Sequence, residues 1–68
     1  MITELRLTID PVKLVSAMAR LELNITELAR RAGTSRVTMQ HWVNARSLTP
    51  KQLGKLAKAL EVDVNDLI

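Results

Sequence analysis

The sequence predicts a small, mainly helical domain that begins with one short β-strand. Residues 4–10, ELRLTID, alternate apolar and polar side chains, which is the period-two pattern of a half-buried strand. From Pro11 onward, apolar residues recur every three or four positions, as on the buried face of a helix. Capping residues divide this part into five segments. We therefore expect a strand in residues 1–10, which is a possible dimerisation arm, and five helices in residues 11–68.

Each expected helix begins at a residue type that caps free backbone N–H groups, and two caps include a proline that suits the first turn. In chain order the caps are Asp10-Pro11, Asn24-x-x-Glu27, Ser35, Thr49-Pro50-x-Gln52 and Asp63-x-x-Asp66. The spacing x-x-Glu or x-x-Gln is that of a capping box. The second helix should end at Gly33, a typical C-terminal residue of helices. The third should cover residues 36 to about 44.

The third helix has two distinct faces. Met39, Trp42 and Val43 form an apolar face, and we expect Trp42, the chain's one aromatic residue, to pack in the core. The side chains that project the other way are those of Arg36, Val37, Gln40, His41 and Asn44. Two short helices joined by a glycine turn, the second with such an outward polar face, indicate a helix-turn-helix.

Charge is unevenly distributed along the chain. The net charge is only +3, but no acidic residue lies between Glu27 and Glu61. That interval contains seven cationic residues: Arg30, Arg31, Arg36, Arg46, Lys51, Lys55 and Lys58. Clustered lysines and arginines release counterions when they neutralise phosphates, so this pattern favours a nucleic-acid partner over a merely solvated basic face.

Composition argues against several other classes of protein. The 68 residues include no cysteine and one histidine, so we expect no metal site, no cofactor and no enzymatic activity. No apolar run approaches the roughly 20 residues that a membrane span needs. We expect a soluble cytoplasmic protein.

The run NITELARRAGTSRVTMQHWVNA, followed by TPKQLGKLAKALEVDVNDLI, resembles the lambda-repressor-like, or Xre/Cro, helix-turn-helix family. The resemblance covers residues 11–68. It implies that Arg36, Val37 and His41 contact DNA bases, and we add Gln40 because an amide can pair with adenine. For the DNA backbone, the resemblance and the helix ends together suggest contacts from Asn24, Thr26, Ser35, Thr38, Asn44, Arg46 and Lys51.

The sequence departs from the family pattern in three respects. Ile25 stands where relatives usually have a glutamine that touches DNA, and it could meet a thymine methyl or pack inward. Ala45 stands where a glycine commonly follows the asparagine, so the turn after the third helix should differ. Met18 and Val43 stand where many relatives have a buried Arg–Glu pair, and we expect the two apolar side chains to touch.

The function expected is a sequence-specific double-stranded-DNA-binding transcriptional regulator of phage, plasmid or bacterial type, with repression the expected mode. Two alternatives stay open. One is an antitoxin of the same fold that binds a toxin protein. The other is a protein-interaction module that has lost DNA binding, for which Ile25 is the best argument.

The N-terminal strand has no evident partner in the sequence. We expect it to pair with the same strand of a second copy, with Leu5, Leu7 and Ile9 at the dimer interface, because an unpaired strand edge is a liability that proteins normally cover. A homodimer would suit a palindromic operator. The competing interpretations are dimerisation through the last helix, at Val64, Leu67 and Ile68, and an N-terminal arm without fixed structure.

Overall fold

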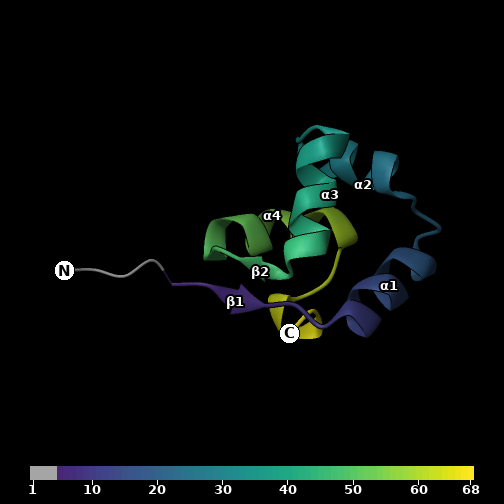
Figure 1. The fold of residues 1–68 in the computed structure, drawn as a ribbon. Coiled ribbons are helices and arrows are strands. Elements are labelled where there is room, and N and C mark those ends of the chain that lie inside the picture. The colour runs from purple at the N-terminus through teal and green to yellow at the C-terminus, as the bar shows by residue number, and fades with distance from the viewer. Residues whose placement is uncertain (1–4) are drawn as a thin grey trace.

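A computed structural model of the protein describes residues 5–68, and within them it contains four α-helices and a two-stranded sheet (Figure 1). The elements in chain order are β1 (Leu7–Thr8), α1 (Pro11–Arg20), α2 (Ile25–Ala32), α3 (Arg36–Ala45), β2 (Ser47–Leu48), α4 (Pro50–Leu60) and a 3₁₀ turn, η1 (Val64–Asp66). The mainly helical prediction is confirmed. The prediction of a fifth helix is wrong, because the last segment forms only this turn.

The predicted caps are confirmed. Asn24 and Glu27 form a reciprocal capping box at α2, in which the Asn24 side chain accepts from the Glu27 amide at 2.8 Å. Thr49 and Gln52 form the same arrangement at α4. Asp63 also has its predicted box, but the following residues close i→i+3 bonds, with the Leu67 amide donating to the Val64 carbonyl at 3.0 Å. The segment thus has the N-terminal signal of a helix, but its i→i+3 bonds form a single 3₁₀ turn.

The N-terminal strand pairs within its own chain. β1 lies antiparallel to β2, with Leu7 opposite Leu48 and Thr8 opposite Ser47. The Arg6 side chain reinforces the pairing through bonds of 3.1 Å to the Ser47 hydroxyl and carbonyl. The expectation that the chain offers no second strand is therefore wrong. Two residues between two helices are too short to show period-two alternation, so the sequence pattern could not reveal β2.

The strand is also shorter than expected. The prediction covered residues 4–10, whereas β1 is Leu7–Thr8. Glu4 and the residues before it lie outside the described part of the chain. Asp10 ends the extended segment, because its carboxylate accepts from the Val12 amide at 2.9 Å and so caps α1.

One core lies between the helices and the sheet. Its fully buried large side chains are those of Ile9, Leu28, Met39, Leu48, Leu53, Leu56, Leu60 and Leu67. Trp42 and Val43 are half-buried and pack against this core from α3, and Met18 does so from α1. The predicted apolar face of α3 is confirmed. Direct contact between Met18 and Val43 stays a prediction.

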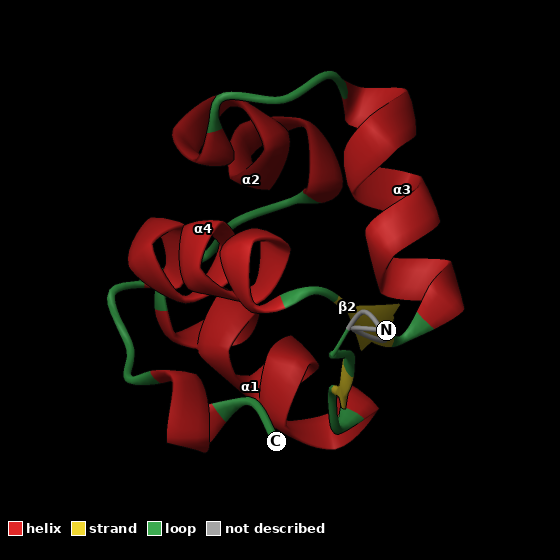
Figure 2. Cartoon of the chain, turned by 90° about the vertical axis from the view of Figure 1, so that its left-hand side faces the viewer, coloured by secondary structure: helices red, strands yellow, loops and turns green. Residues whose placement is uncertain are grey.

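The helices leave one side of α3 uncovered. α2 and α3 lie next to each other at one end of the molecule, and α1 lies at the opposite end (Figures 1 and 2). α4 runs through the middle, where it contacts α2 and β2. Across residues 5–68, no helix is long and apolar enough to cross a membrane.

Candidate nucleic-acid interface

The turn between α2 and α3 is held by backbone and side-chain bonds. Gly33 adopts a left-handed conformation (φ 74°), which glycine enters without steric cost. The next amide, that of Thr34, donates to the Ala29 carbonyl at 2.9 Å. Ser35 then caps α3, since its Oγ accepts from the Thr38 amide at 3.1 Å. The angle at which α3 leaves the turn is thus set locally by Gly33 and Ser35.

The predicted outward face of α3 is exposed. Arg36, Val37, His41 and Asn44 are exposed, and Gln40 is half-buried, whereas Met39 on the other side is completely buried. Val37 is 67% exposed although it is apolar. The four residues predicted to contact bases therefore belong to one helix, and three of them are open to a partner along its first two turns.

Gln40 is oriented by its neighbour one turn later. Its Nε2 donates to the Asn44 Oδ1 at 3.1 Å. This bond leaves the Gln40 Oε1 as an acceptor, and it leaves both amide hydrogens of Asn44 available to donate. An amide held in this way presents a defined pattern of donors and acceptors to a base edge or a phosphate.

The residues predicted to contact the DNA backbone lie at the start of α2, at the cap and on the surface of α3, in the turn after α3 and at the start of α4. Asn24 and Ser35 already accept backbone bonds as helix caps, and Ser35 also donates its hydroxyl to the Thr38 Oγ1 at 2.9 Å. They therefore fix the two helix N-termini, whose backbone N–H groups favour anions. Thr26 is exposed beside the first of these N-termini. Lys51 is exposed in the first turn of α4, the helix that follows α3 and β2 in the chain.

Arg46 forms the turn after α3, and it does so without glycine. It has φ 62°, in the left-handed region, and its amide donates to the Trp42 carbonyl at 3.1 Å. The turn after α3 was expected to differ from the glycine turn of relatives. In this chain Ala45 ends the helix, and the exposed Arg46 adopts the strained left-handed conformation. This places a guanidinium group at the C-terminal end of α3.

Ile25, at the position of the family's glutamine, packs inward. It is half-buried and lies against the core. Of the two possibilities left open by the sequence, the structure supports inward packing over contact with a thymine methyl. No amide can brace α3 from this position, so the caps and the Gln40–Asn44 bond hold the exposed face instead.

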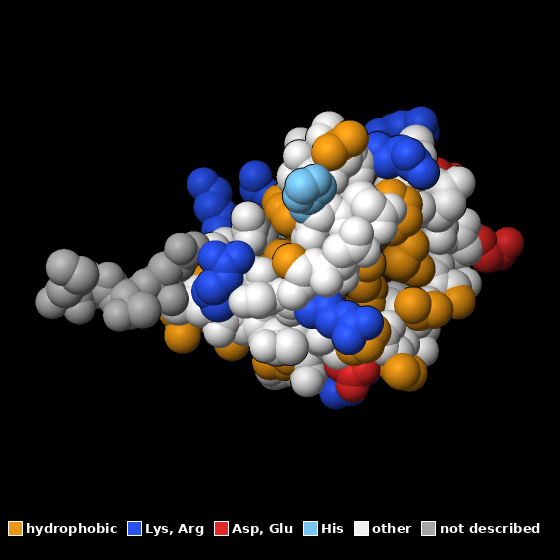
Figure 3. Space-filling view, viewed as in Figure 1, with side chains coloured by type: hydrophobic (Ala, Val, Ile, Leu, Met, Phe, Trp, Pro, Cys, Tyr) orange, Lys and Arg blue, Asp and Glu red, His pale blue; other side chains and the backbone are white. Residues whose placement is uncertain are grey.

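The cationic residues border this face. In Figure 3 the histidine lies over α3, Lys and Arg side chains lie around it, and the acidic side chains lie toward the right and lower edges. Arg31 is engaged in an ion pair with Glu61 at 2.9 Å, which ties α2 to the end of α4. Arg30 is exposed next to it. The surface around α3 is therefore positively charged, as a polyanion partner requires.

The proposed dimer residues divide into two kinds. Ile9 is 1% exposed, and Leu7 is half-buried and packs against the core, so these two side chains serve the chain's own interior. Leu5 is 66% exposed. The competing residue Leu67 is fully buried, whereas Ile68 is exposed. The Ile9 side chain therefore belongs to the chain's own core, whereas the dimer interface predicted at Leu5 and Leu7 stays a prediction.

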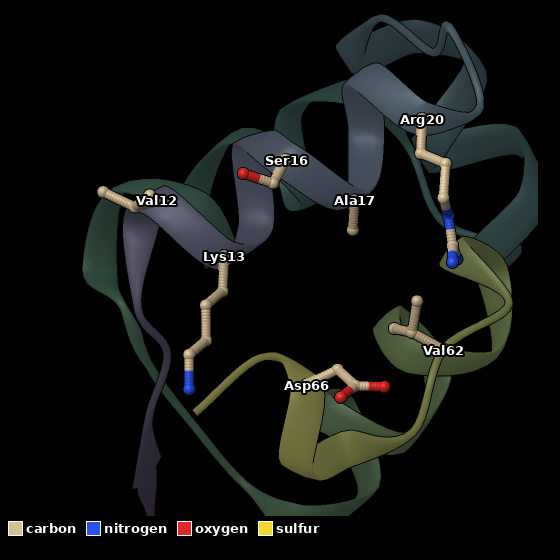
Figure 4. Close-up of a pocket in the computed structure, with 7 residues that line it drawn as sticks. All are labelled: Val12, Lys13, Ser16, Ala17, Arg20, Val62 and Asp66. Atoms are coloured by element: carbon tan, nitrogen blue, oxygen red, sulfur yellow. The ribbon is translucent and has the colours of Figure 1, made fainter.

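A cleft of ≈ 360 Å³ lies away from α3, between α1 and the C-terminal segment (Figure 4). Arg20 reaches from α1 toward that segment and donates to the carbonyls of Leu60 and Glu61, both at 3.4 Å. Asp66 accepts from the Asp63 amide at 3.2 Å. The Arg20 bonds tie the end of α1 to the C-terminal end of α4, whereas the Asp66 bond lies within the C-terminal turn. Among residues 5–68 there is also no group of three or more His, Asp or Glu side chains that could hold a metal ion.

Two helices joined at Gly33, with the outer face of the second exposed and bordered by cations, define a helix-turn-helix domain. Comparison with protein families agrees: residues 17–67 match a family described as helix-turn-helix. Because this match covers most of the chain, the protein belongs to the lambda-repressor/Xre-like helix-turn-helix family, and the resemblance seen in the sequence is confirmed. This is a family of DNA-binding domains.

One solved structure is similar over most of the chain. It is a mutant of a hydroxyethylphosphonate dioxygenase, with a TM-score of 0.73 and 26% sequence identity. The alignment covers 91% of this chain but only 14% of the dioxygenase chain. The likeness thus concerns the helix-turn-helix fold, and the dioxygenase activity is named for the whole of that much longer protein. A comparison with curated proteins found no match.

Proposed function

We propose that the protein is a sequence-specific double-stranded-DNA-binding regulator of transcription that represses by occupying its operator. The observation that carries this proposal is the exposed face of α3, on which Arg36, Val37, His41 and Asn44 project from a helix whose other face is buried. A polar helix face of this kind, presented at one end of a cationic body, suits the major groove. The proposed mechanism needs no cofactor and no chemical step.

We assign affinity and specificity for DNA to two different sets of contacts. Phosphate contacts supply affinity and fix the position of the domain, and we assign them to Asn24, Thr26, Ser35, Thr38, Asn44, Arg46 and Lys51. Base contacts supply specificity, and we assign them to Arg36, Val37, Gln40 and His41. Arg36, Val37 and His41 are exposed on a single helix face, and the half-buried Gln40 lies on the same helix, which supports the assignment.

Selection of bound duplexes from a random DNA pool tests the proposal. We expect a defined sequence to be enriched, with an affinity that falls steeply as salt increases, because bound cations release counterions. If no duplex is retained at low salt, the protein is instead an interaction module that has lost DNA binding. An antitoxin would bind DNA as well, and it would differ by forming a complex with a toxin protein.

We also propose that the protein binds as a homodimer to a palindromic site, through the outer edge of β1. In an antiparallel pair, successive residues direct their N–H and C=O groups alternately toward and away from the partner strand. The Ile9 amide donates to the Arg46 carbonyl at 2.8 Å, on the β2 side. By this alternation the N–H and C=O of Thr8 face away from β2, along the edge on which the Asp10 amide donates to the Leu67 carbonyl at 2.7 Å. A second copy's β1 could pair on this edge at Thr8, before Asp10, and extend the sheet to four strands.

Replacing Thr8 with proline tests this edge. Thr8→Pro removes the outward N–H while leaving the groups that face β2, and proline is tolerated at an edge strand. We expect the variant to sediment as a monomer and to bind one half-site more weakly than the wild type binds the palindrome. Val12→Ala is the control, since it changes an exposed side chain on α1, outside the predicted dimer interface, and should remain dimeric. A dimeric Thr8→Pro variant would exclude the β1 edge.

A further inference from the structure

We propose that Val37 reads the 5-methyl group of a thymine, so that each half-site contains a thymine that uracil cannot replace. This inference rests on the proposed function, and it adds the chemical group that one position of α3 recognises. Val37 lies in the first turn of α3, where a recognition helix comes closest to the bases. It is 67% exposed, and its isopropyl group would otherwise face water.

Val37 stands apart from the other large apolar side chains of α3. Met39 is buried completely, and Trp42 and Val43 pack against the core. Val37 is not part of that core, and as a β-branched residue it is also a poorer helix former than most of the alternatives. Neither packing nor helix propensity explains a valine here.

The major groove offers one kind of apolar group. The edges of adenine, guanine and cytosine present hydrogen-bond donors and acceptors, whereas thymine also presents a methyl group. An isopropyl group placed over a donor or an acceptor removes water from it without replacing the lost bond, which is unfavourable. Placed against a methyl group, the same side chain buries apolar surface on both partners. Val37 therefore favours thymine by contact and disfavours the other bases by desolvation.

The residues next to Val37 on the exposed face of α3 are hydrogen-bonding ones. Arg36 precedes it with a guanidinium group that suits guanine, and Gln40 lies one turn later on the same face with its amide fixed by Asn44. Val37 is thus one apolar position between two hydrogen-bonding positions. A half-site read in this way contains a methyl group flanked by polar base edges.

Substitution of uracil for thymine removes the methyl group and leaves all hydrogen-bonding groups of the base in place. In a duplex selected from a random pool, each thymine is replaced by deoxyuridine in turn, and the dissociation constant is measured at fixed salt. We expect one position per half-site at which the wild-type protein binds about fourfold more weakly, the ratio that corresponds to burial of one methyl group. Val37→Ala should bind the thymine and uracil duplexes with nearly equal affinity.

Val12→Ala is the matched control, because it truncates an equally exposed valine (72%) on α1, at the opposite end of the molecule. It should keep the wild-type ratio between the thymine and uracil duplexes. If the wild type binds both duplexes equally at every position, or if Val37→Ala keeps the full ratio, the inference is overturned while DNA binding stands. Failure to select any duplex would instead overturn the proposed function. Val37 is exposed and alanine is the better helix former, so its truncation should leave the circular-dichroism spectrum unchanged and should not lower the melting temperature.

Discussion

The amide of Ile9 and the carbonyl of Arg46 are joined by a hydrogen bond of 2.8 Å, which ties the N-terminal strand to the turn that ends α3. The Ile9 side chain is 1% exposed and belongs to the core. The Arg46 backbone also closes α3, through its bond to the Trp42 carbonyl. The segment before α1 is therefore a structural support of the proposed recognition helix.

Truncation of Ile9 tests this support. Ile9→Ala should lower the free energy of unfolding by about 2–5 kcal/mol, because it removes a fully buried side chain and leaves a cavity. Leu5→Ala in the same segment should change it by less than about 0.5 kcal/mol, since Leu5 is largely exposed. Urea denaturation measures both. Equal, small effects would show that β1 contributes little to the fold.

Arg36 should contribute to specificity. Arg36→Ala is expected to weaken binding to the selected duplex by about 1–3 kcal/mol and to relax one position of the selected sequence, since arginine commonly makes bidentate contacts to guanine. The measurements are a binding titration and a repeated selection with the variant. An equal loss of affinity on selected and random duplexes would make Arg36 a phosphate contact instead.

Lys51 should contribute to affinity without specificity. Lys51→Ala is expected to weaken binding to selected and random duplexes alike, and to reduce the slope of log affinity against log salt by about one. Lys13→Ala on α1 is the control, because Lys13 lines the cleft that lies away from α3. It should leave the slope unchanged. A loss confined to the selected duplex would contradict the role given to Lys51.

Arg46 should lower the stability of the fold, because of its left-handed conformation, and raise the affinity for DNA through its guanidinium group. Arg46→Gly is expected to stabilise the fold by about 0.5–1 kcal/mol relative to Arg46→Ala, because only glycine adopts the left-handed conformation without strain. Both variants lack the guanidinium group, so both should bind DNA more weakly than the wild type and to a similar degree. Melting temperatures and binding titrations check the two parts separately. Retention of wild-type affinity by either variant would remove Arg46 from the proposed backbone contacts.

Local signals in the sequence located the four α-helices, although the same kind of signal at Asp63 predicted a fifth helix where only a 3₁₀ turn forms. The boxes at Asn24 and Thr49 and the glycine at position 33 act over a few residues, so the sequence shows them directly. The outward face of α3 followed from its periodicity. The β1–β2 pairing was missed because it joins residues about forty positions apart and depends on where α3 and α4 place the short segment Ser47–Leu48. The left-handed turn at Arg46 was expected to differ, but its residue could not be predicted, since arginine has no local preference for that conformation.

The pairing of β1 with β2 also has a consequence for the order of folding. The contacts between α2 and α3 join neighbouring parts of the chain, and those between α2 and α4 span α3, whereas Leu7 meets Leu48 only after a still longer loop has closed. Such closure costs chain entropy and is generally completed after local contacts have formed. The strand should therefore dock onto an already collapsed helical body, and weakening it at Ile9 should mainly accelerate unfolding while the rate of folding changes little. The docking of β1 should therefore determine the unfolding rate, and with it the lifetime of the folded recognition helix.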